Sequence, residues 1–156
     1  MRLTDILTAD RVQVATHRDG IRSKPEVIAR LAELLAPAAS REPPAIQKIL
    51  ADRELLQSTG IGDGVAIPHG SLDTLQQQTA AVLLCPEGVE FEAIDGRPVR
   101  IVVGVIGPRR STGEHLRMLA RISRLLRDGS FRDRLLSSPD GALAFQAISH
   151  EEEARP

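Results

Sequence analysis

The residues of this chain that are best suited to chemistry lie in one stretch, Arg53–Gly70, which reads RELLQSTGIGDGVAIPHG. It contains three glycines within five residues, and such a cluster marks backbone that adopts positive φ or lets another group approach closely. The apolar run Val65–Ile67 follows and is typical of a buried strand. Pro68 suits the end of that strand, because proline has no N–H to donate to a strand ladder. The pattern therefore predicts that His69 stands at a strand terminus, where its imidazole is presented to visiting groups.

Three roles are open to the His69 imidazole. A phosphoryl acceptor needs one ring nitrogen without a proton, with the other N–H held by a backbone carbonyl, and nearby donors that spread the transferred charge. The guanidinium of Arg53, the hydroxyls of Ser58 and Thr59, and the N–H groups of the glycine loop are suitable donors. A structural histidine and a metal ligand are the alternatives. The metal alternative lacks support, because no HxxxH or HxH spacing occurs and Cys85 lies in an apolar run expected to be a core strand.

A second histidine, His115, lies near the start of a helix that an S-x-x-E capping signature at 111–114 predicts. The backbone N–H groups at a helix N-terminus attract anions, so a neutral His115 could donate an N–H to an oxyanion there. A histidine at the edge of the core with one hydrogen bond is the alternative. We interpret His17 as a loop residue and His150 as a tail residue, neither with a chemical role.

The elements that must position these histidines alternate between strands and helices. Continuous apolar runs at 80–85 and 101–106 are typical of central strands covered on both faces. Shorter strands are expected at 12–15, 65–67 and 89–93. Helices are expected at about 24–36, 45–56, 112–127, 131–137 and 140–148, with a proline-rich connection at 37–44. We therefore expect an α/β fold with one mixed β-sheet of about five strands and helices on both faces.

Length and composition predict a single domain over residues 1–150, followed by a charged, frayed tail at 151–156. The 20 basic and 21 acidic residues give a net charge of −1, which argues against nucleic acid or an anionic membrane as a partner. Trp and Tyr are absent, which disfavours sites that stack bases or sugars. No apolar run approaches the roughly 18 residues of a membrane span. The first ten residues lack the apolar core of a secretory signal peptide, and a single cysteine, Cys85, cannot form an internal disulfide. We expect a cytoplasmic protein without cofactor, metal or membrane insertion.

The segment STGIGDGVAIPHG, preceded by RE, resembles the active-site segment of the type-2 (mannitol/fructose-like) enzyme IIA domains of the bacterial phosphoenolpyruvate-dependent phosphotransferase system. FEAIDGRPVRIVVGVIGP at 91–108 and HLRMLARISRLL at 115–126 follow in the order of that family, so the resemblance covers about residues 3–148. The chain is most similar to the stand-alone nitrogen-type enzyme IIA, a regulatory branch. The resemblance implies the enzyme IIA fold, with the same α/β architecture.

The resemblance also implies roles for individual residues. His69 would be phosphorylated through Nε2 by a phosphohistidine on a small HPr-like carrier protein. Arg53 and His115 would stabilise the phosphoryl group. Further contacts to that group are expected from Ser58, Thr59 and Gly70.

Two related functions follow from this resemblance. One is a phosphocarrier that acts as a regulator in the nitrogen branch, with targets such as sensor kinases or potassium transporters. The other is a sugar-transport enzyme IIA that passes its phosphoryl group to a cysteine of enzyme IIB in a fructose or mannitol permease, as a component of a phosphotransferase. A metal-dependent hydrolase that uses His69 and His115 is a third hypothesis, from a different class, with little support.

Overall fold

Two long antiparallel strands, β5 (Thr79–Val89) and β6 (Val99–Pro108), form the centre of a mixed sheet. The computed structural model describes residues 1–155, and the strand order in it is β1-β5-β6-β3-β2, with β4 also paired to β6. The shorter strands are β1 (Val12–Val14), β2 (Gly60–Gly62), β3 (Val65–Ala66) and β4 (His69–Leu72). The α-helices within these residues are α1 (Lys24–Ala39), α2 (Pro43–Leu56), α3 (Thr112–Leu125), α4 (Gly129–Leu136) and α5 (Gly141–Ala154).

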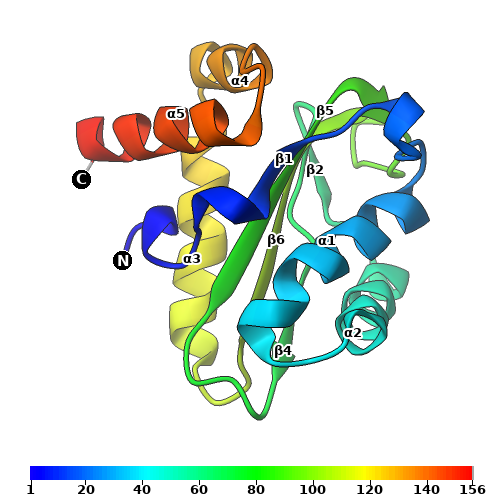
Figure 1. Ribbon diagram of the computed structural model, residues 1–156, viewed down its shortest axis with the longest axis vertical. Coiled ribbons are helices and arrows are strands. Elements are labelled where there is room, and N and C mark those ends of the chain that lie inside the picture. Colours follow the sequence, from blue (N-terminus) through cyan, green and yellow to red (C-terminus); the bar gives the residue numbers. More distant parts are fainter. Residues whose placement is uncertain (156) are drawn as a thin grey trace.

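Helices cover both faces of this sheet, which confirms the predicted α/β architecture. Figure 1 shows α1 and α2 on one side and α3, α4 and α5 on the other. The central strands are apolar on both faces because successive side chains of a strand point in opposite directions. On β5, for example, Leu83 packs against α1 and α2, while Val82 packs in the layer of α3, α4 and α5. Gly104 of β6 allows a close helix, since a Cβ there would lie 3.2 Å from Leu31 of α1.

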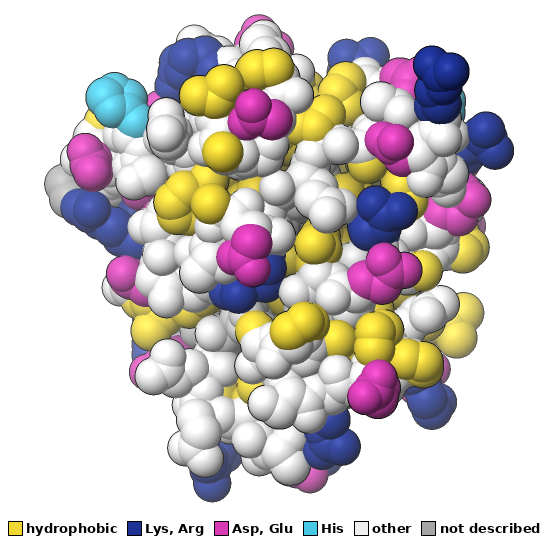
Figure 2. Space-filling view, in the orientation of Figure 1, with side chains coloured by type: hydrophobic (Ala, Val, Ile, Leu, Met, Phe, Trp, Pro, Cys, Tyr) yellow, Lys and Arg dark blue, Asp and Glu magenta, His cyan; other side chains and the backbone are white. Residues whose placement is uncertain are grey.

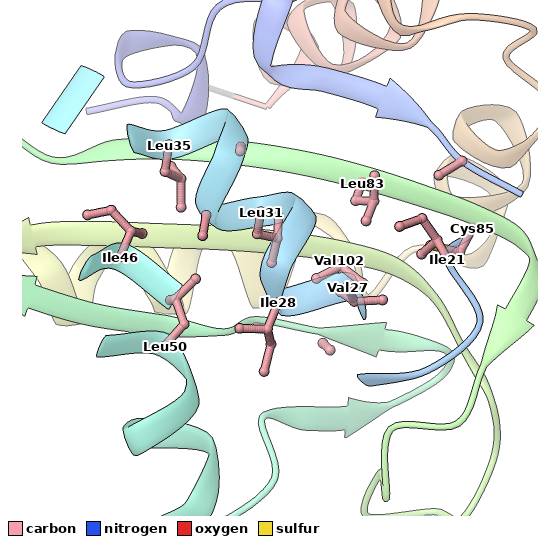
Figure 3. Packing of buried hydrophobic residues seen from close by; sticks show 14 of the residues in the cluster. Ile21, Val27, Ile28, Leu31, Leu35, Ile46, Leu50, Leu83, Cys85 and Val102 are labelled. Atoms are coloured by element: carbon pink, nitrogen blue, oxygen red, sulfur yellow. The ribbon is translucent and has the colours of Figure 1, made fainter. Parts of the chain in front are cut away.

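Helices α1 and α2 form the layer that leads into the glycine loop. Figure 3 shows their buried side chains directed at the sheet, among them Leu31, Leu35, Ile46 and Leu50. The connection between them is shorter than the predicted 37–44, because α1 continues through Pro37 and α2 begins at Pro43. Pro37 lies in the last turn of α1, where Ala39 is still buried. Pro43 occupies the first helical position, where an N–H would have no helical partner.

The segment that carries His69 is one strand path interrupted at its middle. β3 and β4 both run parallel to β6, with Ala66 opposite Val102 and His69 opposite Val105. Because the path breaks at Ile67 and Pro68, residues 1–155 form six strands where about five were expected. His69 is the first residue of β4, so it stands at a strand terminus as predicted, but at the start of a second strand and not after the end of the run 65–67. The residues after it, 70–72, also belong to β4.

The opposite layer ties the two ends of the chain together. The carboxylate of Glu152 on α5 is fully buried and accepts hydrogen bonds from the backbone N–H groups of Leu3 (2.7 Å) and Thr4 (2.9 Å). The Nε of Arg121 on α3 donates to the same carboxylate at 3.0 Å. The expected frayed tail at 151–156 is therefore wrong for the residues up to Ala154, which continue α5. Residue 156 lies outside the described residues.

The surface shows no large region of one charge on the face drawn in Figure 2, where acidic and basic side chains are interspersed. This distribution agrees with the net charge of −1. Along residues 1–155, helices long and apolar enough to span a bilayer are absent.

Candidate functional site

The His69 ring is held by the interruption between β3 and β4. Its Nδ1 lies 2.7 Å from the carbonyl oxygen of Ile67, the first residue of that interruption. A carbonyl oxygen only accepts hydrogen bonds, so Nδ1 carries the proton and Nε2 of the neutral ring keeps its lone pair. The side chain is half-buried, so the site remains open to solvent on one side. This is the arrangement that a phosphoryl acceptor requires.

The electrostatic surroundings keep His69 neutral. Burial lowers the pKa of the imidazole, and the positive charge of Arg53 lowers it further. The hydrogen bond to Ile67 and the carboxylate of Glu54 act in the opposite direction, and the net shift is below the usual value of 6.5. A neutral ring at physiological pH keeps the Nε2 lone pair available as a nucleophile.

The second imidazole, His115, lies in the first turn of α3 and is brought beside His69. The two ring centroids are 5.7 Å apart, and the ring planes are tilted by 55°. The Nδ1 of His115 lies 3.2 Å from Oε1 of Gln78, and Gly107 of β6 leaves room for that edge of the ring, because a Cβ there would lie 2.8 Å from Nδ1. Burial lowers the pKa of His115, and charge on His69 lowers it further.

Arg53 reaches the site from the last turn of α2. It is half-buried, and its Nη1 donates to the carbonyl oxygen of Gln57 at 2.9 Å. A guanidinium has five N–H donors, so this single bond leaves most of them available to an anion. The structure therefore places His69 and His115 side by side, and Arg53 is near enough for its positive charge to lower the pKa of His69.

The neighbouring Glu54 has a different environment. Its buried carboxylate accepts hydrogen bonds from the backbone N–H of Thr59 (2.9 Å) and the hydroxyl of Thr59 (2.6 Å). The ammonium of the half-buried Lys24 lies 3.0 Å away and forms an ion pair with this carboxylate. Because Glu54 connects the end of α2 to the glycine loop and to α1, it holds the segment that precedes β2 in place.

The hydroxyls of Ser58 and Thr59 are occupied by protein groups. Thr59 donates its proton to Glu54, and Ser58 donates to the carbonyl oxygen of Phe91 at 2.8 Å. Neither hydroxyl proton is free for the phosphoryl contact expected from the sequence. Gly70 has a packing role, because a Cβ there would overlap Cγ2 of Ile49 and separate α2 from β4.

Gln78 is the site residue that the sequence did not indicate. It closes a run of three glutamines, and only the structure distinguishes it, since Gln76 and Gln77 are exposed and Gln78 is buried. Its partner His115 is 37 positions away in the chain, so no local spacing could have linked the two residues.

Other reactive groups do not extend this site. Within residues 1–155 no three His, Cys, Asp or Glu side chains are grouped so that they could hold a metal ion. Cys85 is buried on β5, and burial raises the pKa of its thiol to about 12. It is a packing residue, as expected, because a thiol with so high a pKa forms almost no thiolate at neutral pH.

Comparison with known proteins identifies the family. Residues 5–151 match the family described as "Phosphoenolpyruvate-dependent sugar phosphotransferase system, EIIA 2". The chain belongs to this EIIA 2 family. The EIIA 2 relatives include the nitrogen regulatory protein of Pseudomonas aeruginosa, 37% identical over 153 residues (95% of this chain and 95% of the relative). The nitrogen regulatory protein of Bradyrhizobium diazoefficiens is 32% identical over 149 residues (96% and 95%).

Solved EIIA 2 structures agree with this assignment. The crystal structure of nitrogen regulatory protein IIA-Ntr from Neisseria meningitidis superposes with a TM-score of 0.84 at 30% identity, over 92% of this chain and 97% of that one. The mannitol enzyme IIA of Escherichia coli, solved in complex with phosphorylated enzyme IIB, has the same fold, with a TM-score of 0.75 at 23% identity over 92% of this chain and 96% of that one.

A sugar-specific protein is also among the relatives. A fructose-specific EIIA component of Haloferax volcanii is 29% identical, over 88% of this chain and 90% of the relative.

Proposed function

We propose that this EIIA 2 protein is a phosphocarrier whose His69 accepts a phosphoryl group from a phosphohistidine on an HPr-like carrier protein in the cytoplasm. The observation that carries the proposal is the hydrogen bond between His69 Nδ1 and the carbonyl oxygen of Ile67. It fixes the tautomer in which Nε2 is unprotonated, and the half-buried ring can still be reached from solvent. A nucleophile in this state needs no general base.

The bond changes at His69 and at the donor histidine balance without a proton leaving or joining either ring. The Nε2 lone pair of His69 forms a bond to phosphorus, while the P–N bond of the donor breaks and its electron pair returns to the donor's ring nitrogen. The proton on Nδ1 of His69 stays on that nitrogen and keeps its hydrogen bond to the Ile67 carbonyl oxygen. This hydrogen bond becomes stronger once the ring carries positive charge. The product is an Nε2-phosphohistidine.

Arg53 and His115 are proposed to stabilise the transferred group. The phosphoryl oxygens carry the developing charge, and a planar guanidinium with unoccupied N–H groups suits two of them at once. His115 on α3 is placed to bind another phosphoryl oxygen, since the centroid of its ring lies 5.7 Å from that of His69. Ser58 and Thr59 take part indirectly, because their hydrogen bonds hold the loop between α2 and β2. Gly70 acts through packing: because it has no side chain, α2, which carries Arg53, can lie close to β4.

The donor protein is proposed to dock over exposed leucines on the two helices that carry Arg53 and His115. Leu55 and Leu56 at the end of α2 are 85% and 81% exposed, and Leu116, next to His115, is 60% exposed. Exposed apolar residues around a polar centre are typical of protein-binding surfaces. The transfer requires a second protein to bring its own histidine within direct reach of His69, and the half-buried His69 ring is exposed to solvent on one side.

Incubation with phosphoenolpyruvate, enzyme I and an HPr-like carrier tests the acceptor. We expect an acid-labile phosphoprotein that carries one phosphoryl group on His69. His69→Ala should abolish labelling, and His150→Ala, at an exposed position on α5, should label as the wild type does. Full labelling of His69→Ala would refute the site.

The physiological role is proposed to be regulation in the nitrogen branch, with sensor kinases or potassium transporters as targets. Two relatives named nitrogen regulatory protein, 37% and 32% identical over nearly the whole chain, support this branch. Sugar transport is the second candidate, in which His69 passes its phosphoryl group to an enzyme IIB cysteine. The fructose-specific relative at 29% identity supports that alternative.

Partner capture with the phosphorylated and unphosphorylated protein separates the two roles. A regulator should bind different partners in the two states, so identical partner sets would contradict it. Rapid loss of the phosphoryl group to the cysteine of a purified fructose or mannitol enzyme IIB would instead favour transport. His69→Ala serves as the unphosphorylatable control in both assays.

A further inference from the structure

The buried side chain of Gln78 connects His115 to the backbone of α3. Gln78 lies in the segment before β5 and is 6% exposed. Its Oε1 is 3.2 Å from Nδ1 of His115, and its Nε2 donates to the carbonyl oxygen of Glu114 at 3.5 Å. A side-chain amide has one accepting end and one donating end, so both ends are used here.

The direction of these two bonds sets the tautomer of His115. The carbonyl oxygen of Glu114 only accepts, so the NH₂ group of Gln78 must face it and Oε1 must face His115. Nδ1 of His115 therefore carries the proton, and Nε2 of the neutral ring is an acceptor. His69 has the same tautomer, held by the carbonyl oxygen of Ile67. Two neighbouring imidazoles thus both present an unprotonated Nε2.

This arrangement protects the nucleophile before transfer. If neutral His115 carried its proton on Nε2, that N–H could hydrogen-bond to the Nε2 lone pair of His69 and occupy it. The same arrangement is unfavourable after transfer, because a lone pair on His115 repels phosphoryl oxygens. His115 can donate to the phosphoryl group only if Nε2 gains a proton while Nδ1 stays bonded to Gln78.

We propose that Gln78 is a positioning residue that makes His115 bind the phosphoryl group only as an imidazolium, so that phosphorylation of His69 takes up one proton from solvent onto Nε2 of His115. This inference rests on the phosphocarrier function proposed above. The added proton offsets part of the negative charge that the phosphoryl group brings. His115 is half-buried, so the proton has a path from water.

The surroundings of His115 support a change of charge on phosphorylation. The groups that face it are His69 from β4 and the uncharged Gln78 and Gly107. Glu114, the residue before it on α3, is exposed and contributes only its backbone carbonyl oxygen, which accepts from Gln78. In the resting protein, burial lowers the pKa of His115 and charge on His69 lowers it further. A dianionic group a few ångströms away favours the protonated ring and raises that pKa.

Nitrogen NMR of the imidazole side chains tests the resting state without any phosphotransfer. In the unphosphorylated wild type, above the pKa of His115, we expect the proton on Nδ1. Gln78→Leu removes the acceptor and should move the proton to Nε2, the form that free imidazole side chains prefer. Gln77→Leu, at the exposed neighbour, should leave the spectrum of His115 unchanged. A proton on Nε2 in the wild type, or no change in Gln78→Leu, would overturn the proposal.

The pH dependence of phosphorylation tests the proton uptake. The equilibrium constant for transfer from one donor should be compared between wild type and Gln78→Leu, since the titration of the donor cancels in the ratio. Where resting His115 is neutral and phosphorylated-state His115 is charged, the ratio of wild type to variant should fall about tenfold per pH unit. A ratio independent of pH would overturn the coupling.

A conservative variant guards against a simple loss of folding. Gln78→Glu keeps an acceptor that faces Nδ1, so His115 should retain its Nδ1 proton. The negative charge of the introduced carboxylate also favours the imidazolium before phosphorylation, so the position of the proton on the ring is the quantity to compare in this variant. A neutral His115 in phosphorylated wild type would overturn this inference and leave the phosphocarrier function standing. Absence of label on His69 in the wild type would overturn the function itself, together with the coupling that rests on it.

Discussion

The protein contains two polar centres that differ in how many of their hydrogen-bonding groups have a partner within the protein. At the ends of the chain, the fully buried Glu152 accepts two backbone N–H groups and the Arg121 guanidinium. At the strand interruption, His69 and His115 are half-buried, and each uses Nδ1 but has an Nε2 that accepts or donates nothing to the described residues. A satisfied buried centre stabilises the fold, whereas an open, half-buried centre is available to a visiting group.

The sharpest test of this difference removes the open centre. His69→Gln should abolish phosphorylation entirely and change the free energy of unfolding by less than about 1 kcal/mol, because it deletes one hydrogen bond of a half-buried side chain. Labelling from an HPr-like carrier and urea unfolding measure the two quantities. A large loss of stability would mean that the histidine centre is also structural.

The converse substitution removes the satisfied centre. Glu152→Ala leaves two backbone N–H groups and Arg121 without their buried partner and should lower the free energy of unfolding by about 3 kcal/mol. Phosphorylation of the folded fraction should be unchanged, since α5 makes no contribution to the His69 site. Glu153→Ala, at the exposed adjacent position, is the matched control and should cost less than about 0.5 kcal/mol.

A smaller effect is expected for Arg53, which belongs to the open centre but does not form the bond to phosphorus. Arg53→Gln should slow phosphorylation about a hundredfold, the usual loss for one preorganised donor to a developing charge. It should also raise the pKa of His69, because the guanidinium charge lowers it in the wild type. Rapid-quench labelling and an NMR titration measure these changes, with the exposed Arg110→Gln as control. An unchanged rate would exclude Arg53 from the site.

The smallest expected effect is on the pH dependence of the free energy of unfolding. The pKa values of His69 and His115 are lowered in the folded protein from 6.5, so the unfolded chain binds more protons between the folded values and 6.5. The free energy of unfolding should therefore rise with pH through that window and level off above it. Urea unfolding across the window should show a shallower slope for the double variant His69→Gln, His115→Gln. An equal slope would mean that these rings titrate normally.

Several features could be predicted because they leave a local pattern. The apolar runs of β5 and β6 indicate buried strands from their composition alone, and the S-x-x-E signature at 111–114 places the start of α3. His69 and His115 stand out as histidines next to such signals. Predictions failed where the local signal was ambiguous, as at Pro37, which a helix tolerates in its last turn. Pro68 is ambiguous in a similar way: it suits the end of a strand, but here it lies in a short break between β3 and β4.

The amino-acid sequence by itself determined the order of strands and helices, the apolar faces that build the two layers, and the histidines available for chemistry. All of these depend on periodicity and capping over a few neighbouring residues. Only the tertiary structure decided that Glu152 binds the backbone at Leu3, 149 positions away, and that the buried one of three glutamines bonds to His115. Such contacts depend on which surfaces the packed layers bring together. Hydrogen bonds between distant segments leave no periodic trace in the chain, and here they determine which ring nitrogens are free.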